Sequence, residues 1–94
     1  MAEVFLSPEI ALPQYEGLRE DPGRRKALER VDEILDALEE DPGRAWLRAH
    51  RFRSPPLWCV TFDASGEAWA ILWSMDDDED DRVLVDYIGP ASFA

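Results

Sequence analysis

The sequence has almost no cysteine or histidine, and it has no long apolar run. It contains one cysteine, Cys59, and one histidine, His50, in 94 residues. A lone cysteine excludes an internal disulfide framework and a cysteine-based zinc site, and a lone histidine excludes a histidine-based metal site. No apolar run approaches the roughly 20 residues that span a bilayer, and the first residues lack a signal core. We therefore expect one soluble cytoplasmic domain, residues 1–94, without cofactor, metal or membrane contact.

Basic residues are also scarce, and they are unevenly distributed. Ten lysine and arginine residues are set against 21 aspartate and glutamate residues, which gives a formal net charge of −11. Such a chain has no general electrostatic attraction to nucleic acid or to an anionic membrane. The exception is the segment 42–62, which we call the basic segment. It has no acidic residue and carries the cationic and titratable side chains Arg44, Arg48, His50, Arg51 and Arg53.

Hydrophobic periodicity predicts an α+β fold. A short strand at Val4–Leu6 is followed by a short helical or irregular stretch to about residue 19. Asp21 and Pro22 open a helix that runs to about Glu40 and has one apolar face. Extended segments follow at residues 46–52, 57–62, 67–73 and 82–88, with a hairpin turn at 63–66. We expect the helices to pack on one face of a twisted antiparallel sheet.

The basic segment is the first candidate site. An arginine guanidinium directs two donors at one phosphate, and histidine is the residue type that exchanges protons near neutral pH. Alternate residues of a strand share a face, so Arg51 would act with Arg53, and His50 would share the other face with Arg48. All of these groups converge only if a helical turn or a bulge intervenes. The competing interpretation is that the arginines form surface ion pairs with nearby carboxylates, such as Glu29, Asp36 or Asp41.

Two further features also have competing interpretations. The acidic run Asp76–Asp81 predicts a solvated charged loop over residues 74–81, and the alternative is that it lies over the basic segment as an internal phosphate mimic. Among the four tryptophans, Trp69 and Trp73 are expected in the core against the long helix. Trp46 and Trp58 stay open between core packing and nucleobase stacking.

Several segments resemble the RelE/ParE toxin superfamily. They are a first strand ending in Phe5–Glu9, a helix ending in Leu35–Pro42, and strands at Leu57–Phe62, Ala70–Trp73 and Val83–Gly89. The resemblance implies a compact α+β domain that is encoded beside an antitoxin. It also implies an activity, which is either mRNA cleavage on the ribosome or poisoning of gyrase.

The resemblance further implies a catalytic site on the concave face of the sheet. By position it selects Arg51 and Arg53 on the strand after the long helix, and Arg82 and Tyr87 on the last strand. His50 joins them on chemical grounds alone. In this hypothesis the arginines bind phosphate and stabilise developing charge, while His50 or Tyr87 exchanges protons. The residues expected to bind RNA are Arg44, Arg48, Arg51 and Arg53.

Two functions remain open from the sequence. The first is a RelE-like toxin of a toxin–antitoxin system, a metal-independent endoribonuclease that acts on ribosome-bound mRNA. The second is a non-catalytic acidic interaction module on the same scaffold, a degenerate toxin homologue that binds a basic protein partner. The basic segment favours the first function, and the net charge of −11 favours the second.

Overall fold

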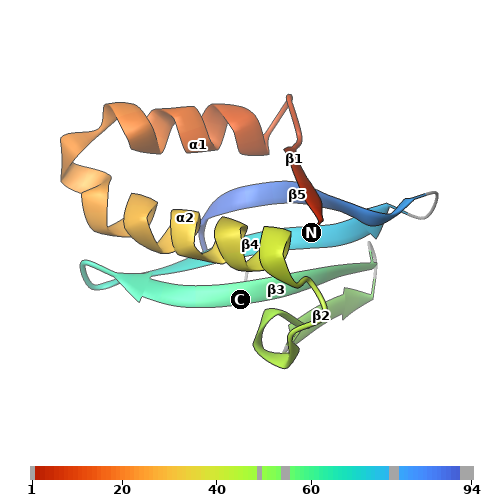
Figure 1. Cartoon of the computed structure of the whole chain (residues 1–94). Helices are drawn as coiled ribbons and strands as arrows, with labels where there is room; N and C mark the ends of the chain where they lie inside the picture. The colour runs from red at the N-terminus through yellow and green to blue at the C-terminus, as the bar shows by residue number, and fades with distance from the viewer. Residues whose placement is uncertain (1, 49, 54–55, 77–78, 92–94) are drawn as a thin grey trace.

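Two α-helices and a five-stranded sheet make up the fold (Figure 1). The structure is a computed structural model, and it describes residues 2–48, 50–53, 56–76 and 79–91. In chain order the elements are β1 (Glu3–Leu6), α1 (Ala11–Glu20), the 3-10 helix η1 (Pro22–Arg24), α2 (Arg25–Glu40), the 3-10 helix η2 (Ala45–Arg48), β2 (His50–Arg53), β3 (Pro56–Ala64), β4 (Glu67–Asp76) and β5 (Glu79–Pro90). The predicted α+β class is confirmed.

The sheet is mixed, with the strand order β1-β5-β4-β3-β2. β1 pairs with β5 in parallel, with Phe5 opposite Leu84, and the other three strand pairs are antiparallel. The prediction of a wholly antiparallel sheet is therefore wrong at this one pair. A parallel pair needs a long crossover connection between its strands. Such a connection is present, because the chain runs through both helices and the three other strands between β1 and β5. β2 ends the sheet at the edge opposite β1.

The stretch expected to be helical or irregular to about residue 19 contains a regular helix, α1, and Pro13 lies inside it. α1 begins at Ala11, so Pro13 lies in the first turn, where its missing N–H has no partner to lose within the helix. The Ser7 hydroxyl accepts hydrogen bonds from the backbone N–H groups of Ile10, at 3.2 Å, and of Ala11, at 3.1 Å. These contacts order the approach to the helix.

The same turn precedes each of the next two helical elements. The Asp21 carboxylate accepts a hydrogen bond from the Gly23 N–H at 2.9 Å, and the Asp41 carboxylate accepts one from the Gly43 N–H at 3.0 Å. The first turn leads through η1 into α2, which ends at Glu40 as predicted. The second turn leads into η2, which occupies part of the predicted strand 46–52.

Side chains on the helix-covered face of the sheet form the core. They alternate along β3, β4 and β5, and they are Val60, Phe62, Trp69, Ile71, Trp73, Val83, Val85 and Ile88. They pack against the apolar stripe of α2, where Val31, Ile34 and Leu38 are fully buried. The predicted core positions of Trp69 and Trp73 are confirmed. In the described chain both helices lie on this side of the sheet, and the opposite face is uncovered (Figure 1).

The hairpins β3–β4 and β4–β5 test the turn predicted at residues 63–66 and the loop predicted at residues 74–81. Ser65 and Gly66 have positive φ angles of 53° and 81°, which is the backbone geometry of the tight turn predicted at residues 63–66. The charged loop predicted over residues 74–81 is wrong in its extent, because β4 continues to Asp76 and β5 begins at Glu79. Backbone pairing extends the ladder, and like charges on opposite strands oppose it only weakly. Residues 77–78 lie outside the described residues, so the hypothesis that the acidic run acts as an internal phosphate mimic stays a prediction.

Candidate functional site

The 3-10 helix η2 determines how the basic segment presents its arginines. Leu47 is fully buried, and its carbonyl oxygen accepts a hydrogen bond from Trp73 Nε1 at 3.0 Å. This contact fixes η2 against the core. The chain then enters β2, the edge strand, at His50. The helical turn on which convergence of the arginines depended is therefore present.

Arg48 and Arg51 meet on the ring of Trp58, and we call these three residues the Arg–Trp cluster. Arg51 pairs with Trp58 across β2 and β3, so the two side chains share a face of the sheet. The guanidinium carbon lies 4.8 Å from the Trp58 ring centroid for Arg51 and 4.4 Å for Arg48. Both distances are within the range of cation–π attraction. Arg48 therefore acts with Arg51, and not with His50 as a continuous strand would require.

In the described part of the chain, the two arginines of the cluster are not paired with a carboxylate. Among the side chains that the structure describes, neither Arg48 nor Arg51 forms an ion pair. Arg48 is exposed, and it donates from Nε to the carbonyl oxygen of Pro42 at 2.8 Å. Arg44 differs, because it pairs with Glu40 at 3.2 Å. The ion-pair interpretation thus fits Arg44 and does not fit the Arg–Trp cluster.

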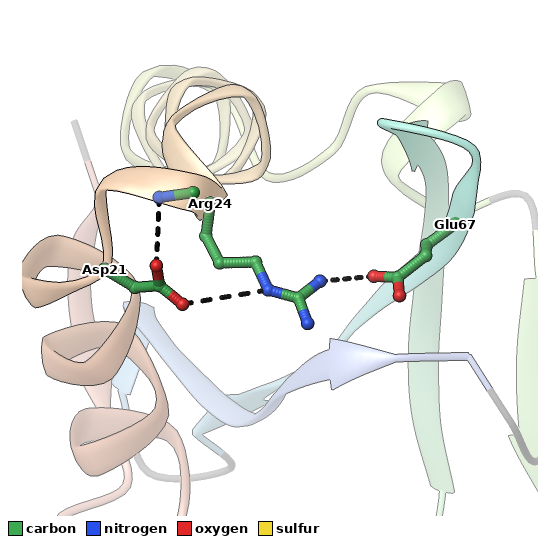
Figure 2. A network of polar contacts seen from close by, with 4 residues as sticks. Asp21, Arg24 and Glu67 are labelled. Carbon is green, nitrogen blue, oxygen red and sulfur yellow. Dashed lines mark hydrogen bonds and ion pairs between the residues drawn. The ribbon is translucent and has the colours of Figure 1, made fainter.

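A second arginine–tryptophan contact, at the other corner of the molecule, is neutralised. Figure 2 shows Arg24 between Asp21 and Glu67, with its guanidinium in contact with both carboxylates. The guanidinium also lies 5.3 Å from the ring centroid of Trp69, which is buried. This contact ties the corner between α1 and α2 to the start of β4. Its charge is already balanced, so it has a structural role.

His50 lies on the uncovered face of the sheet. It pairs with Cys59, which pairs with Leu72, which in turn pairs with Tyr87, so these four residues form one row across the sheet. His50 is exposed, and Cys59 is buried beside it. Burial raises the pKa of the Cys59 thiol, so the thiol stays protonated and acts as a small apolar group. The backbone of Arg53 belongs to β2, and its side chain lies outside what the structure describes.

The two predicted site residues on β5 are remote from the Arg–Trp cluster. β5 and β2 are three strand spacings apart, about 14 Å at about 4.8 Å each. Arg82 lies over the ring of Phe5, 5.0 Å from its centroid. The Tyr87 hydroxyl donates to the carbonyl oxygen of Pro90 at 2.8 Å, and the ring runs over Gly89, where a Cβ would come within 2.8 Å of that hydroxyl. The structure therefore does not bring Arg82 or Tyr87 to the same point as Arg51.

Sequence reasoning missed one titratable group on the uncovered face. The ladder between β4 and β5 is irregular between Leu72 and Trp73, and Asp86 is the extra residue on β5 at that point. Asp86 is half-buried and lies 3.4 Å from the Ser74 hydroxyl. Burial raises the pKa of its carboxyl group, and the hydrogen bond from Ser74 partly opposes this. No local pattern marks a bulge here, so the sequence offered no signal for it.

No family model, curated protein or solved structure matches the chain. The described residues include no group of three metal-ligating side chains. No helix in the described part of the chain is long and apolar enough to cross a bilayer. The Arg–Trp cluster is therefore the feature of the described chain that bears most directly on function.

Proposed function

We propose that this protein is a RelE/ParE-type toxin domain that binds ribosome-associated mRNA through its Arg–Trp cluster. The observation that carries the proposal is the pair of guanidiniums held on Trp58, at 4.4 and 4.8 Å, with no carboxylate paired to either among the described side chains. Most other arginines in the described chain are neutralised by Asp or Glu. In a chain of net charge −11, an unneutralised pair is where a polyanion is attracted.

The cluster is suited to phosphate. Arg48 is exposed and its Nε is held by the Pro42 carbonyl, so its guanidinium is oriented before binding and can offer its terminal amino groups to a phosphate as a fork. Arg51 lies on the same ring, so both forks are oriented before binding, and less side-chain entropy is lost on contact. Two adjacent phosphates of one RNA strand are the natural ligand of two such forks.

The edge position of β2 gives the cleavage step of this proposal its geometry. Arg51 and His50 are consecutive residues whose side chains face opposite sides of the edge strand, so the cleavage step requires an RNA strand that bends around this edge, with its phosphate at Arg51 and the adjacent ribose at His50. Arg51 then stabilises charge on the phosphate, and His50 takes the proton of the ribose 2′-hydroxyl. The 2′-oxygen bonds to phosphorus, and the 5′-oxygen leaves with a proton from water. Arg82 and Tyr87 take no part in this proposal.

Expression of the protein without its neighbouring genes tests the proposal. The wild type is expected to arrest growth and to cut reporter mRNA during translation. The variant Arg48→Ala/Arg51→Ala is expected to do neither, and Arg24→Ala/Arg25→Ala, which removes equal charge elsewhere, is expected to behave like the wild type. Normal growth and intact mRNA with the wild type would remove the toxin function. Arrest that survives the loss of both cluster arginines would remove the site.

A non-catalytic interaction module is the second candidate function. It is favoured by the exposed side of α2, which carries acidic side chains along its length: Glu29, Glu33, Asp36, Glu39 and Glu40. It is also favoured by the distance between Tyr87 and the Arg–Trp cluster, which leaves His50 as the one nearby group for proton exchange. Such a module would bind a basic protein segment through α2.

The same expression experiment separates the two candidates when a binding measurement is added. The interaction module predicts normal growth, together with binding of a basic peptide that weakens when Asp36 and Glu39 are replaced by Asn and Gln. The toxin function predicts growth arrest that does not depend on those two residues. Replacing them leaves the Arg–Trp cluster unchanged, so the variant discriminates cleanly.

A further inference from the structure

Trp46 is the exposed tryptophan of this protein. Its side chain is 47% exposed, whereas Trp69 and Trp73 are buried and Trp58 is half-buried. The exposed indole presents an aromatic ring surface to solvent, and such a surface can stack a planar ligand. Trp46 lies in η2, two residues before Arg48. In a 3-10 helix that spacing corresponds to about 4 Å along the axis and to two rotations of about 120°, so the two side chains leave different sides of the same turn.

Trp58 has little ring surface left for a ligand. Arg48, Arg51 and the ring of Trp73 lie 4.4, 4.8 and 4.8 Å from the Trp58 ring centroid. These neighbours orient the guanidiniums, so the role of Trp58 is to support the arginines. A nucleobase that approaches this part of the surface must therefore stack on another ring. Among the side chains that the structure describes, Trp46 is an exposed aromatic residue close to the cluster in the chain.

We propose that Trp46 stacks an unpaired nucleobase whose neighbouring phosphates bind Arg48 and Arg51. The proposal rests on the proposed RNA-binding function and adds the class of ligand, which is single-stranded nucleic acid. A base within a duplex already stacks on its neighbours and cannot turn its face to a side chain, whereas an unpaired base can. The basic segment thereby combines a cationic track with one stacking platform, the combination typical of single-strand binding.

Buried neighbours fix the position of Trp46 relative to the arginines. Leu47 follows it in η2 and is fully buried, and the Leu47 carbonyl is bonded to Trp73. Arg48 comes next and is tied to the Pro42 carbonyl. Trp46 and Arg48 therefore flank an anchored residue on one rigid turn. A nucleotide bound by both needs no rearrangement of the backbone.

Three polyanion probes test the proposal with the full-length protein. The first is a fluorescently labelled oligouridylate, the second is the same strand annealed to oligoadenylate, and the third is inorganic polyphosphate of similar length, which carries charge and no bases. The variants are Trp46→Ala, Trp46→Phe and Arg48→Ala/Arg51→Ala. Phe5→Ala is the matched control, because Phe5 is 44% exposed and lies at the opposite edge of the sheet.

Trp46→Ala is expected to weaken oligouridylate binding by about 5- to 150-fold, which is the usual effect of losing one base–aromatic stack. It is expected to leave polyphosphate binding unchanged, and Trp46→Phe is expected to restore much of the loss. Phe5→Ala should change neither affinity, and the double arginine variant should weaken both. Intrinsic fluorescence of the wild type should be quenched on binding oligouridylate and not on binding polyphosphate.

The contrary outcomes of this experiment distinguish failure of the stacking role, of the ligand class and of the RNA-binding function. If Trp46→Ala and wild type bind oligouridylate equally, the stacking role is overturned and the phosphate-binding function stands. If the duplex binds as tightly as the single strand, the assignment of the ligand class is overturned. If Trp46→Ala weakens polyphosphate binding as much as oligouridylate binding, the effect is structural, and the proposal fails. If the wild type binds none of the three probes, the stacking role and the RNA-binding function both fail.

Discussion

Trp58 and Trp69 both lie beneath arginines, and the surroundings of these two contacts differ. Trp69 lies beneath Arg24, whose guanidinium is in contact with carboxylates on both sides (Figure 2). Trp58 lies beneath Arg48 and Arg51, for which the described residues provide no carboxylate. Stacking an arginine on an aromatic ring is common to both. The neighbouring charge decides which contact is structural and which can attract a ligand.

The sequence Asp-Pro-Gly-Arg forms a four-residue corner at each contact, with the same hydrogen bond from the glycine N–H to the aspartate. Arg24 is the last residue of the first corner, and the Arg–Trp cluster lies after the second. The chain takes different paths beyond the two corners. The first corner continues into a sixteen-residue helix and brings Arg24 to the start of β4 beside Glu67. The second corner continues into a single turn and then into the edge strand. The same local turn therefore precedes a neutralised arginine in one place and two arginines without a carboxylate partner among the described residues in the other. The difference lies in the elements that each corner packs against.

Replacing the two rings should give the largest difference. Trp69→Ala removes a buried core side chain and is expected to lower the free energy of unfolding by about 3–5 kcal/mol. Trp58→Ala removes a half-buried ring, so the expected loss is roughly 1–3 kcal/mol. Urea unfolding measures both. For RNA affinity per folded molecule the order should reverse, because the loss of Trp58 releases Arg48 and Arg51. Equal affinities of the two folded variants would contradict the division of roles.

Replacing the arginines should separate the two contacts by their salt dependence. Each phosphate neutralised on a single strand contributes about −0.7 to the slope of log affinity against log salt concentration. Arg48→Ala/Arg51→Ala should therefore make the slope shallower by about 1.4. Arg24→Ala/Arg25→Ala removes the same charge from the neutralised corner and should leave the slope unchanged. An equal change of slope in both double variants would show that net charge, and not the cluster, controls binding.

The pH dependence of stability provides a control that involves neither contact. Burial raises the pKa of Asp86 above its ordinary value of 3.8, so ionisation of this carboxyl group destabilises the folded state. Its contribution is therefore most favourable below pH 3.8 and is lost as the pH rises through the raised value. Asp86→Asn should accordingly stabilise the protein at neutral pH and lose that advantage in acid, as measured by thermal unfolding at several pH values. A constant difference at every pH would argue against a burial effect. RNA affinity should not change.

The sequence predicted those parts of the fold that local chemistry determines. The helix ending at Glu40 follows from its apolar stripe and from the capping turn at Asp21, and the hairpin at Ser65–Gly66 follows from turn chemistry. The core positions of Trp69 and Trp73 follow from alternation along one strand. In each case the deciding residues are close together in the chain.

The candidate site was less predictable because long-range contacts create it. η2 is too short to have its own periodicity, and it is held by Trp73, which lies 26 residues beyond Leu47. Without that turn, Arg48 would have been assigned to the face of His50. Likewise, the bulge that places Asp86 exists only in the pairing of β5 with β4. The sequence located the basic segment, and packing determined which of its arginines act together.

The smallest expected effect is also the most direct test of the comparison. If neighbouring carboxylates silence the Arg24 contact, Glu67→Gln should make it resemble the Arg–Trp cluster. RNA affinity should then rise, by no more than about fivefold, because one charge contact in water is worth about 1 kcal/mol, and Asp21 remains 3.9 Å from Arg24 Nε.

Glu9→Gln removes the same charge from an exposed site without a paired arginine among the described residues, so it should raise affinity less. Stability should fall by less than about 1 kcal/mol in Glu67→Gln, as for other surface pairs. Equal affinities of the two variants would mean that overall charge alone is responsible, and that Arg24 is silent for a reason other than its carboxylate partners.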